Sequence, residues 1–194
     1  MRVLVTGGSA SGKSEFAELY LQMLIDAAAV NTAIDGEASS IGKSTTQKYY
    51  IATMPIFGPE DEARKEKHLR ARQGRGFVTI EQTDDLSSLR LPGTNGVGTR
   101  RFALLEDIGN LAANEIFGNN GVSGAADRVA SGALFLASQC ECVVVVSVDV
   151  ARDGICYDPE TCEYIRIIEQ VNRSLAAEFD EVYEVFAGLP KRIK

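Results

Sequence analysis

The sequence predicts an α/β fold with a mainly parallel sheet flanked by helices. Short, continuously apolar runs rich in β-branched residues recur along the chain, and such runs are typical of parallel strands covered on both faces. Stretches with helical spacing of apolar residues lie between them, so strands and helices alternate. A glycine-rich segment separates the first strand from the first helix, which is typical of one class of α/β protein.

The predicted elements follow in chain order. Strands are expected at residues 2–6, 48–53, 102–105, 142–148 and 182–186, with a further candidate at 77–80. Helices are expected at residues 14–25, about 60–72, about 107–117, 125–138 and 161–177. Polar stretches at 31–47 and 92–100 are expected to be loops. No linker divides the chain, so residues 1–194 are predicted to form a single domain.

Composition excludes several classes of protein. Of the 194 residues 45% are hydrophobic, which favours a globular fold, and the formal net charge of -7 argues against a general nucleic-acid-binding surface. No apolar run approaches the ~20 residues of a membrane span, and the chain enters its first strand directly. The four cysteines form no C-x-x-C pair, so we expect reduced thiols rather than a metal site. The protein is expected to be cytoplasmic.

The glycine-rich segment reads Gly7-Gly8-Ser9-Ala10-Ser11-Gly12-Lys13-Ser14 and matches the phosphate-binding P-loop pattern. A strand before it and a helix after it supply the context that the pattern needs, so we predict a P-loop NTPase-like, RecA-like fold. Lys13 is expected to reach the β- and γ-phosphates, and the Ser14 hydroxyl to hold Mg²⁺. A similar string, Gly42-Lys43-Ser44-Thr45, has Glu37 where the first glycine should stand and is predicted to be a loop.

A basic segment, residues 61–76, contains six basic and three acidic residues in an otherwise acidic chain. His68, the only histidine, lies in its middle. A neutral imidazole is a competent nucleophile, and neighbouring cations could neutralise a triphosphate under attack. A solvated helix face with a surface histidine is the alternative, and the spacing by itself favours that alternative.

Several blocks, in order along the chain, resemble one known family. They are Leu4-Val5-Thr6-Gly7-Gly8 with Ser11-Gly12-Lys13-Ser14, Tyr50-Ile51-Ala52-Thr53, Asp61-Glu62-Ala63-Arg64 with His68 and Arg72, Leu104-Leu105-Glu106 with Asn114, and the carboxyl end from Val171-Asn172-Arg173 to Lys194. The P-loop by itself is unspecific, but the ordered combination is specific. On these blocks the sequence resembles the CobU family, the bifunctional adenosylcobinamide kinases and adenosylcobinamide-phosphate guanylyltransferases.

The resemblance implies two reactions on a corrinoid substrate and a homotrimeric assembly. A nucleoside triphosphate, ATP or GTP, phosphorylates the aminopropanol hydroxyl of adenosylcobinamide. GTP then transfers GMP to His68 with release of pyrophosphate, and the GMP passes to adenosylcobinamide phosphate to give adenosylcobinamide-GDP.

The residues offer partners for the nucleotide in both reactions. Arg64, Arg70 and Arg72 are expected to clamp its phosphates. Glu106 ends an apolar strand and is expected to hold Mg²⁺, with Asp107 as the neighbouring candidate. A simple acid at a helix N-terminus is the alternative interpretation of Glu106.

The sequence also departs from the family pattern. Ala10 stands where the family usually has Arg, residues 26–47 form a longer connection, and residues 148–155 lack the Asn and the first Gly of the family's N-E-V-G segment. Two other functions therefore stay open. One is a different small-molecule P-loop kinase in which His68 takes no part, and the other is a nucleotide-binding regulatory protein without turnover.

Overall fold

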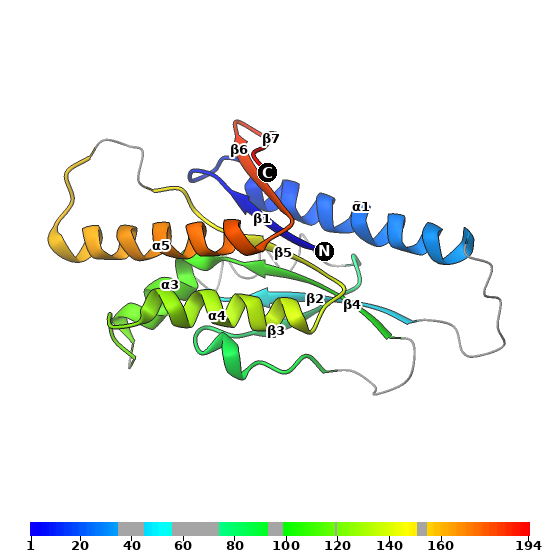
Figure 1. The fold of residues 1–194 in the computed structure, drawn as a ribbon, viewed down its shortest axis with the longest axis horizontal. Coiled ribbons are helices and arrows are strands. Elements are labelled where there is room, and N and C mark those ends of the chain that lie inside the picture. Colours follow the sequence, from blue (N-terminus) through cyan, green and yellow to red (C-terminus); the bar gives the residue numbers. More distant parts are fainter. Residues whose placement is uncertain (35–44, 56–73, 93–98, 119, 151–154) are drawn as a thin grey trace.

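The computed structural model describes residues 1–34, 45–55, 74–92, 99–118, 120–150 and 155–194. The elements in this part of the chain are β1 (Arg2–Thr6), α1 (Lys13–Ile34), β2 (Thr45–Ala52), β3 (Phe77–Glu81), the 3₁₀ turn η1 (Leu86–Ser88), β4 (Thr99–Glu106), α3 (Ile108–Phe117), α4 (Ala125–Ser138), β5 (Cys142–Val146), α5 (Pro159–Glu178), β6 (Glu181–Phe186) and β7 (Leu189–Arg192). The described strands form one sheet in the order β3-β2-β4-β5-β1-β6-β7 (Figure 1). All neighbours are parallel except β6 and β7. The predicted fold class is confirmed.

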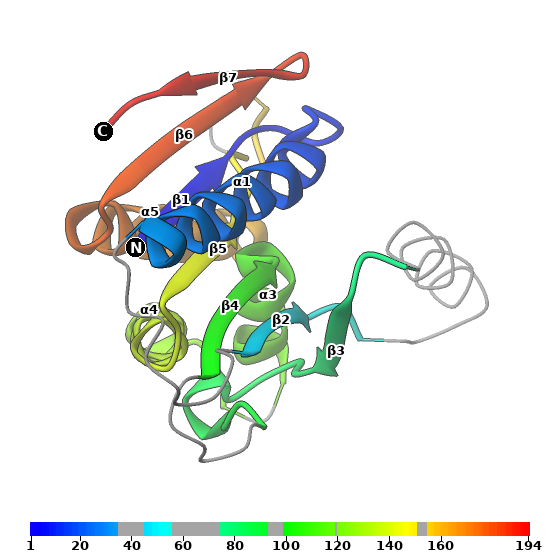
Figure 2. The same cartoon turned by 90° about the vertical axis from the view of Figure 1, so that its right-hand side faces the viewer.

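Helices cover both faces of the sheet (Figure 2). The face toward α1 carries one apolar cluster, and the face toward α3, α4 and α5 carries a larger one. Every residue of β5 is buried, because this strand lies between β4 and β1 in the centre of the sheet. Such central strands need apolar side chains on both faces, which explains the continuous valine run. The described helices include none long and apolar enough to cross a membrane.

Several element boundaries differ from the predictions. Helix α1 continues to Ile34 instead of ending at residue 25, because its second half is alanine-rich and alanine favours helix without forming an apolar stripe. Strands β2 and β4 begin at Thr45 and Thr99, inside the predicted loops, where they pair with each other. Strand β5 ends at Val146, before the predicted residue 148. The predicted helix at about 60–72 lies outside the described residues.

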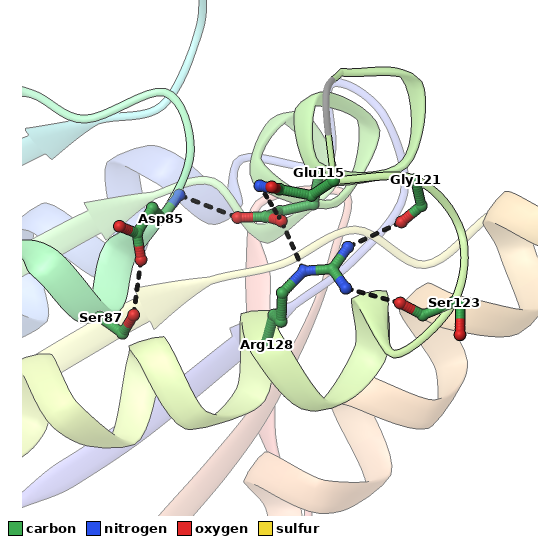
Figure 3. Close-up of polar contacts among 7 residues, drawn as sticks. Asp85, Ser87, Glu115, Gly121, Ser123 and Arg128 are labelled. Carbon is green, nitrogen blue, oxygen red and sulfur yellow. Dashed lines mark hydrogen bonds and ion pairs between the residues drawn. The ribbon is translucent and has the colours of Figure 1, made fainter.

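The packing of α3 against α4 depends on a buried ion pair (Figure 3). Glu115 on α3 has a side chain that is 3% exposed, and its Oε2 accepts a hydrogen bond from Arg128 Nε on α4 at 2.8 Å. Its Oε1 accepts from the backbone N–H of Asp85, just before η1, at 2.8 Å. Arg128 also donates to the carbonyl oxygens of Gly121 and Ser123 in the α3–α4 connection. One carboxylate therefore ties together three segments distant in sequence.

We expect Glu115→Gln to lower the free energy of unfolding by about 3 kcal/mol, because it leaves a partly buried guanidinium without its counter-charge. Glu163→Gln is the matched control, since the Glu163–Arg166 pair is exposed on one helix and is worth below about 1 kcal/mol. Urea unfolding of both variants measures the difference. Equal effects in the two variants would contradict this role for Glu115.

The same ion pair predicts a pH dependence of stability. Burial by itself would raise the pKa of Glu115, but the hydrogen bonds from Arg128 and the Asp85 amide outweigh it, so the pKa lies below its ordinary value. The pair therefore stabilises the fold above about pH 4, and this contribution is lost as the pH falls through the lowered pKa. Wild type should lose more stability than Glu115→Gln between pH 6 and pH 3.

Candidate functional site

The P-loop lies at the carboxyl edge of the sheet, between the end of β1 and the start of α1. Lys13 is the first residue of α1 and is 9% exposed, and its Nζ donates to the carbonyl oxygen of Gly8 at 3.1 Å. The amine therefore lies over the loop rather than in solvent. Ala10 has a φ of 55°, a left-handed conformation that is unfavourable for alanine and is typical of a loop held in shape by its surroundings.

Two backbone hydrogen bonds hold the P-loop from opposite sides. The N–H of Asp149, just after β5, donates to the carbonyl oxygen of Gly7 at 3.1 Å. The N–H of Gly188, in the turn between β6 and β7, donates to the carbonyl oxygen of Ser11 at 2.8 Å. A Cβ at Gly12 would lie 3.1 Å from the Gly188 Cα, so this close approach of two backbones favours glycine at position 12.

An acidic pair lies at the end of β4, separated from β1 by β5 alone. Glu106 is the last residue of the strand, and its Oε2 accepts a hydrogen bond from the Tyr50 hydroxyl at 3.0 Å. Asp107 caps α3 by accepting from the Asn110 N–H at 2.7 Å. Burial raises the pKa of Asp107 and the neighbouring Glu106 adds to this, while Lys13 acts in the opposite direction. Because Asp107 is the helix cap, Glu106 is the better candidate for a metal ligand.

Thr53 and Asn114 fix the ends of three strands beside the acidic pair. The Thr53 hydroxyl donates to the carbonyl oxygen of Asp107 at 2.8 Å and accepts from its N–H at 2.7 Å. The Asn114 side chain donates to the carbonyl oxygens of Thr53 and Thr83, at 2.9 and 2.7 Å. Both residues belong to blocks that resemble the family, but the sequence gave no role for their side chains. Each side chain forms hydrogen bonds with backbone groups of segments distant in the chain, which a sequence pattern does not reveal.

Comparison with known families matches residues 3–193 to the CobU family, described as cobinamide kinase / cobinamide phosphate guanyltransferase. The chain belongs to the CobU family. Two curated relatives bear the name bifunctional adenosylcobalamin biosynthesis protein CobU. The one from Escherichia coli is 28% identical over 208 residues, and the one from Salmonella typhimurium is 28% identical over 206 residues. Each alignment covers 100% of both chains.

Solved structures with a similar fold have much lower sequence identity. A KaiC-like protein from Pyrococcus horikoshii is 12% identical with a TM-score of 0.44, over 94% of this chain and 71% of that one. A DnaB-like replicative helicase is 10% identical with a TM-score of 0.49, over 94% of this chain and 46% of that one.

The segment that departs from the CobU pattern starts at the edge of the P-loop. Ser147 is fully buried, and its N–H donates to the carbonyl oxygen of Val5 at 2.8 Å, while its hydroxyl finds no partner within the described segments. The carbonyl oxygen of Val148 accepts a hydrogen bond from the Asn172 side chain on α5 at 3.2 Å. A Cβ at Gly109 would lie 2.9 Å from Val148 Cγ2. Residues 151–154 of this segment lie outside the described residues.

Besides the contact of Asn172 with Val148, α5 has a second contact, which lies next to the acidic pair. The Tyr164 hydroxyl donates to the carbonyl oxygen of Gly109 in the first turn of α3 at 3.2 Å. Burial, with a smaller contribution from the charge of Asp107, raises the pKa of Tyr164 to about 12, so its hydroxyl keeps its proton near neutral pH. Helix α5 therefore supports the edge of the sheet beside the nucleotide loop.

The strand order places the P-loop from Gly7 to Ser14 and Glu106 at the same edge of the sheet, with β5 between their strands, and their joint role in one site stays a prediction. His68, Arg64, Arg70 and Arg72 lie outside the described residues, so their roles stay predictions. Cys140, Cys142, Cys156 and Cys162 are free thiols. Burial raises the pKa of Cys140 to about 12, which makes it unreactive.

Proposed function

We propose that this protein phosphorylates adenosylcobinamide and then transfers GMP from GTP, by way of His68, to give adenosylcobinamide-GDP. The observation that carries the proposal is a P-loop held on both sides by backbone hydrogen bonds, at the same sheet edge as Glu106, in a chain that matches the CobU family over residues 3–193. The curated CobU relatives are named bifunctional and are assigned by name to adenosylcobalamin biosynthesis. We further propose a cytoplasmic homotrimer, which the resemblance to the family implies.

In the kinase step the main task of the protein is to bind and orient the negatively charged phosphates. Backbone N–H groups of the P-loop and the N-terminus of α1 face the phosphates, and Lys13 neutralises charge on the β- and γ-phosphates. The aminopropanol hydroxyl of the corrinoid attacks the γ-phosphorus of ATP or GTP. The bond from that phosphorus to the β,γ-bridging oxygen breaks, the nucleoside diphosphate leaves, and the hydroxyl proton passes to water.

Mg²⁺ fits the described donors at this site. Ser14 lies in the first turn of α1, and Glu106 lies at the end of β4, one strand beyond β5, with one carboxylate oxygen oriented by Tyr50. Oxygen ligands of this kind are those that Mg²⁺ prefers, and it commonly keeps several waters. When bound, Mg²⁺ would neutralise phosphate charge that Lys13 does not reach.

In the guanylyl step a ring nitrogen of neutral His68 attacks the α-phosphorus of GTP. The bond to the α,β-bridging oxygen breaks, pyrophosphate leaves, and a phosphorus–nitrogen bond holds GMP on the protein. A phosphate oxygen of adenosylcobinamide phosphate then attacks the same phosphorus, and the phosphorus–nitrogen bond breaks. Arg64, Arg70 and Arg72 are proposed to hold the phosphates during both displacements.

A second candidate function is a P-loop kinase for another small alcohol, in which His68 takes no part. The expected departure of residues 148–155 from the family's pattern favours it, because the N–H of Asp149 in this segment donates to the P-loop at the carbonyl oxygen of Gly7. Incubation of the protein with GTP, Mg²⁺ and adenosylcobinamide tests the two functions. Formation of adenosylcobinamide-GDP and pyrophosphate supports our proposal. Phosphorylation of a different alcohol without covalent GMP supports the second function.

We expect Glu106→Gln to reduce adenosylcobinamide phosphorylation by about 100-fold, because it removes the charge that would hold Mg²⁺. Glu178→Gln at the exposed end of α5 is the matched control and is expected to behave as wild type. Initial rates at increasing Mg²⁺ concentration measure the effect, and higher Mg²⁺ should partly restore the Glu106→Gln rate. A variant with the wild-type rate at low Mg²⁺ would contradict the assignment.

A further inference from the structure

The β6–β7 hairpin reaches the P-loop through its turn (Figure 2). Ala187 and Gly188 have left-handed φ values of 50° and 78°, as a two-residue hairpin turn needs, and the Gly188 N–H donates to the carbonyl oxygen of Ser11. The base of the hairpin is fixed as well. Tyr20 on α1 donates to Glu181 Oε2 at 2.5 Å, and Arg192 on β7 pairs with the same carboxylate at 2.9 Å. The hairpin is therefore held at both ends, at its turn by the P-loop and at its base by the contacts of Glu181.

The two flanks of the P-loop differ in chemistry. On the β5 and β4 side lie the carboxylates of Glu106 and Asp107, which suit a metal ion and the distal phosphates of a triphosphate. On the β6 side lies the hairpin turn. If the metal-bound end of a triphosphate lay toward Glu106, its nucleoside end would point away from the carboxylates. The nucleoside would then leave the P-loop on the side of the hairpin.

Two exposed apolar side chains flank the turn. Phe186 ends β6 and Leu189 begins β7, and they are paired directly across the antiparallel ribbon, so their side chains lie on the same face. They are 80% and 72% exposed, although Val185, the residue before Phe186, is buried under α1. Exposed aromatic faces bind nucleobases by stacking. An aromatic and an aliphatic side chain next to a phosphate loop suit a purine whose phosphates lie in that loop.

We propose that Phe186 and Leu189 form the subsite against which the purine base of GTP rests. This inference rests on the proposed nucleotide site and adds the position of the base to it. The Gly188 N–H that bonds to Ser11 keeps the subsite at a fixed place relative to the phosphates. The base is bound by apolar contact and stacking, so this subsite contributes affinity for a purine nucleotide.

Calorimetric titration with two ligands tests the subsite. GTP with Mg²⁺ carries a base, and inorganic tripolyphosphate with Mg²⁺ carries only the phosphates. We expect Phe186→Ala to weaken GTP binding about tenfold and Leu189→Ala to weaken it less, with tripolyphosphate affinity unchanged in both. Phe186→Tyr keeps the aromatic ring and should bind GTP as the wild type does. Ile193→Ala is the matched control, because Ile193 is 55% exposed beyond the other end of β7.

The possible outcomes separate this proposal from the proposed function. Unchanged GTP affinity in Phe186→Ala would overturn the subsite and leave the P-loop site intact. Equal weakening of GTP and tripolyphosphate would overturn it too, since the hairpin would then act only by shaping the P-loop. Wild-type protein that binds neither ligand would overturn the nucleotide site and the subsite together.

Discussion

Replacement of Lys13 with alanine is expected to weaken GTP binding by about 100-fold or more while leaving the fold intact. The ammonium group is the one charge that the P-loop sequence directs at the β- and γ-phosphates, and charge-assisted contacts to phosphate are about twice as strong as neutral hydrogen bonds. In the structure its hydrogen bond goes to the carbonyl oxygen of Gly8 in the same loop. Lys13 belongs to neither apolar cluster, so removal of its side chain opens no cavity in them.

Calorimetry with GTP and Mg²⁺, together with thermal unfolding, measures both parts of this expectation. Lys48→Ala is the matched control, because Lys48 lies within β2 and its ammonium group binds Gln22 and faces the Phe77 ring. We expect the control to bind GTP as wild type does. Unchanged GTP affinity in Lys13→Ala would remove the P-loop from the site. A large loss of melting temperature would instead give Lys13 a structural role.

The second large effect is expected for His68→Asn, which should abolish the covalent GMP adduct and pyrophosphate release. Asparagine keeps the side chain polar and of similar reach but has no basic nitrogen to attack phosphorus. Non-covalent GTP binding should stay close to wild type, since it depends on the P-loop. The wild-type adduct should be labile in acid and stable in base, as a phosphorus–nitrogen bond is. A fully active guanylyltransferase with Asn at 68 would contradict the proposed role of His68.

The sequence predicted the centre of the fold well for a physical reason. Strand β5 is buried along its whole length and β1 is buried from Val3 to Val5, so these positions must be apolar, and the P-loop between β1 and α1 has a fixed pattern. Edge elements carry no such signal. Strand β7 is exposed along its whole length and contains Pro190, which argues against a strand, yet backbone pairing with β6 forms it.

The same distinction applies to the candidate site. The P-loop and Glu106 could be marked as candidates because the P-loop directly follows one apolar strand and Glu106 ends another. The contacts that hold them could not, because they join backbone groups distant in sequence. Examples are the Gly188 N–H on the Ser11 carbonyl oxygen and the Thr53 hydroxyl on Asp107. No sequence pattern encodes a contact whose partners are brought together only by the order of strands in the sheet.

The proposed guanylyl transfer is tested by incubation of the wild-type protein with GTP labelled at the α-phosphate, followed by intact-protein mass spectrometry and peptide mapping. We expect one covalently bound GMP per chain, on the peptide that contains His68, with release of an equal amount of pyrophosphate. Non-covalent GTP binding with no label on the protein would contradict the transfer by way of His68. Label on a peptide without His68 would also contradict it.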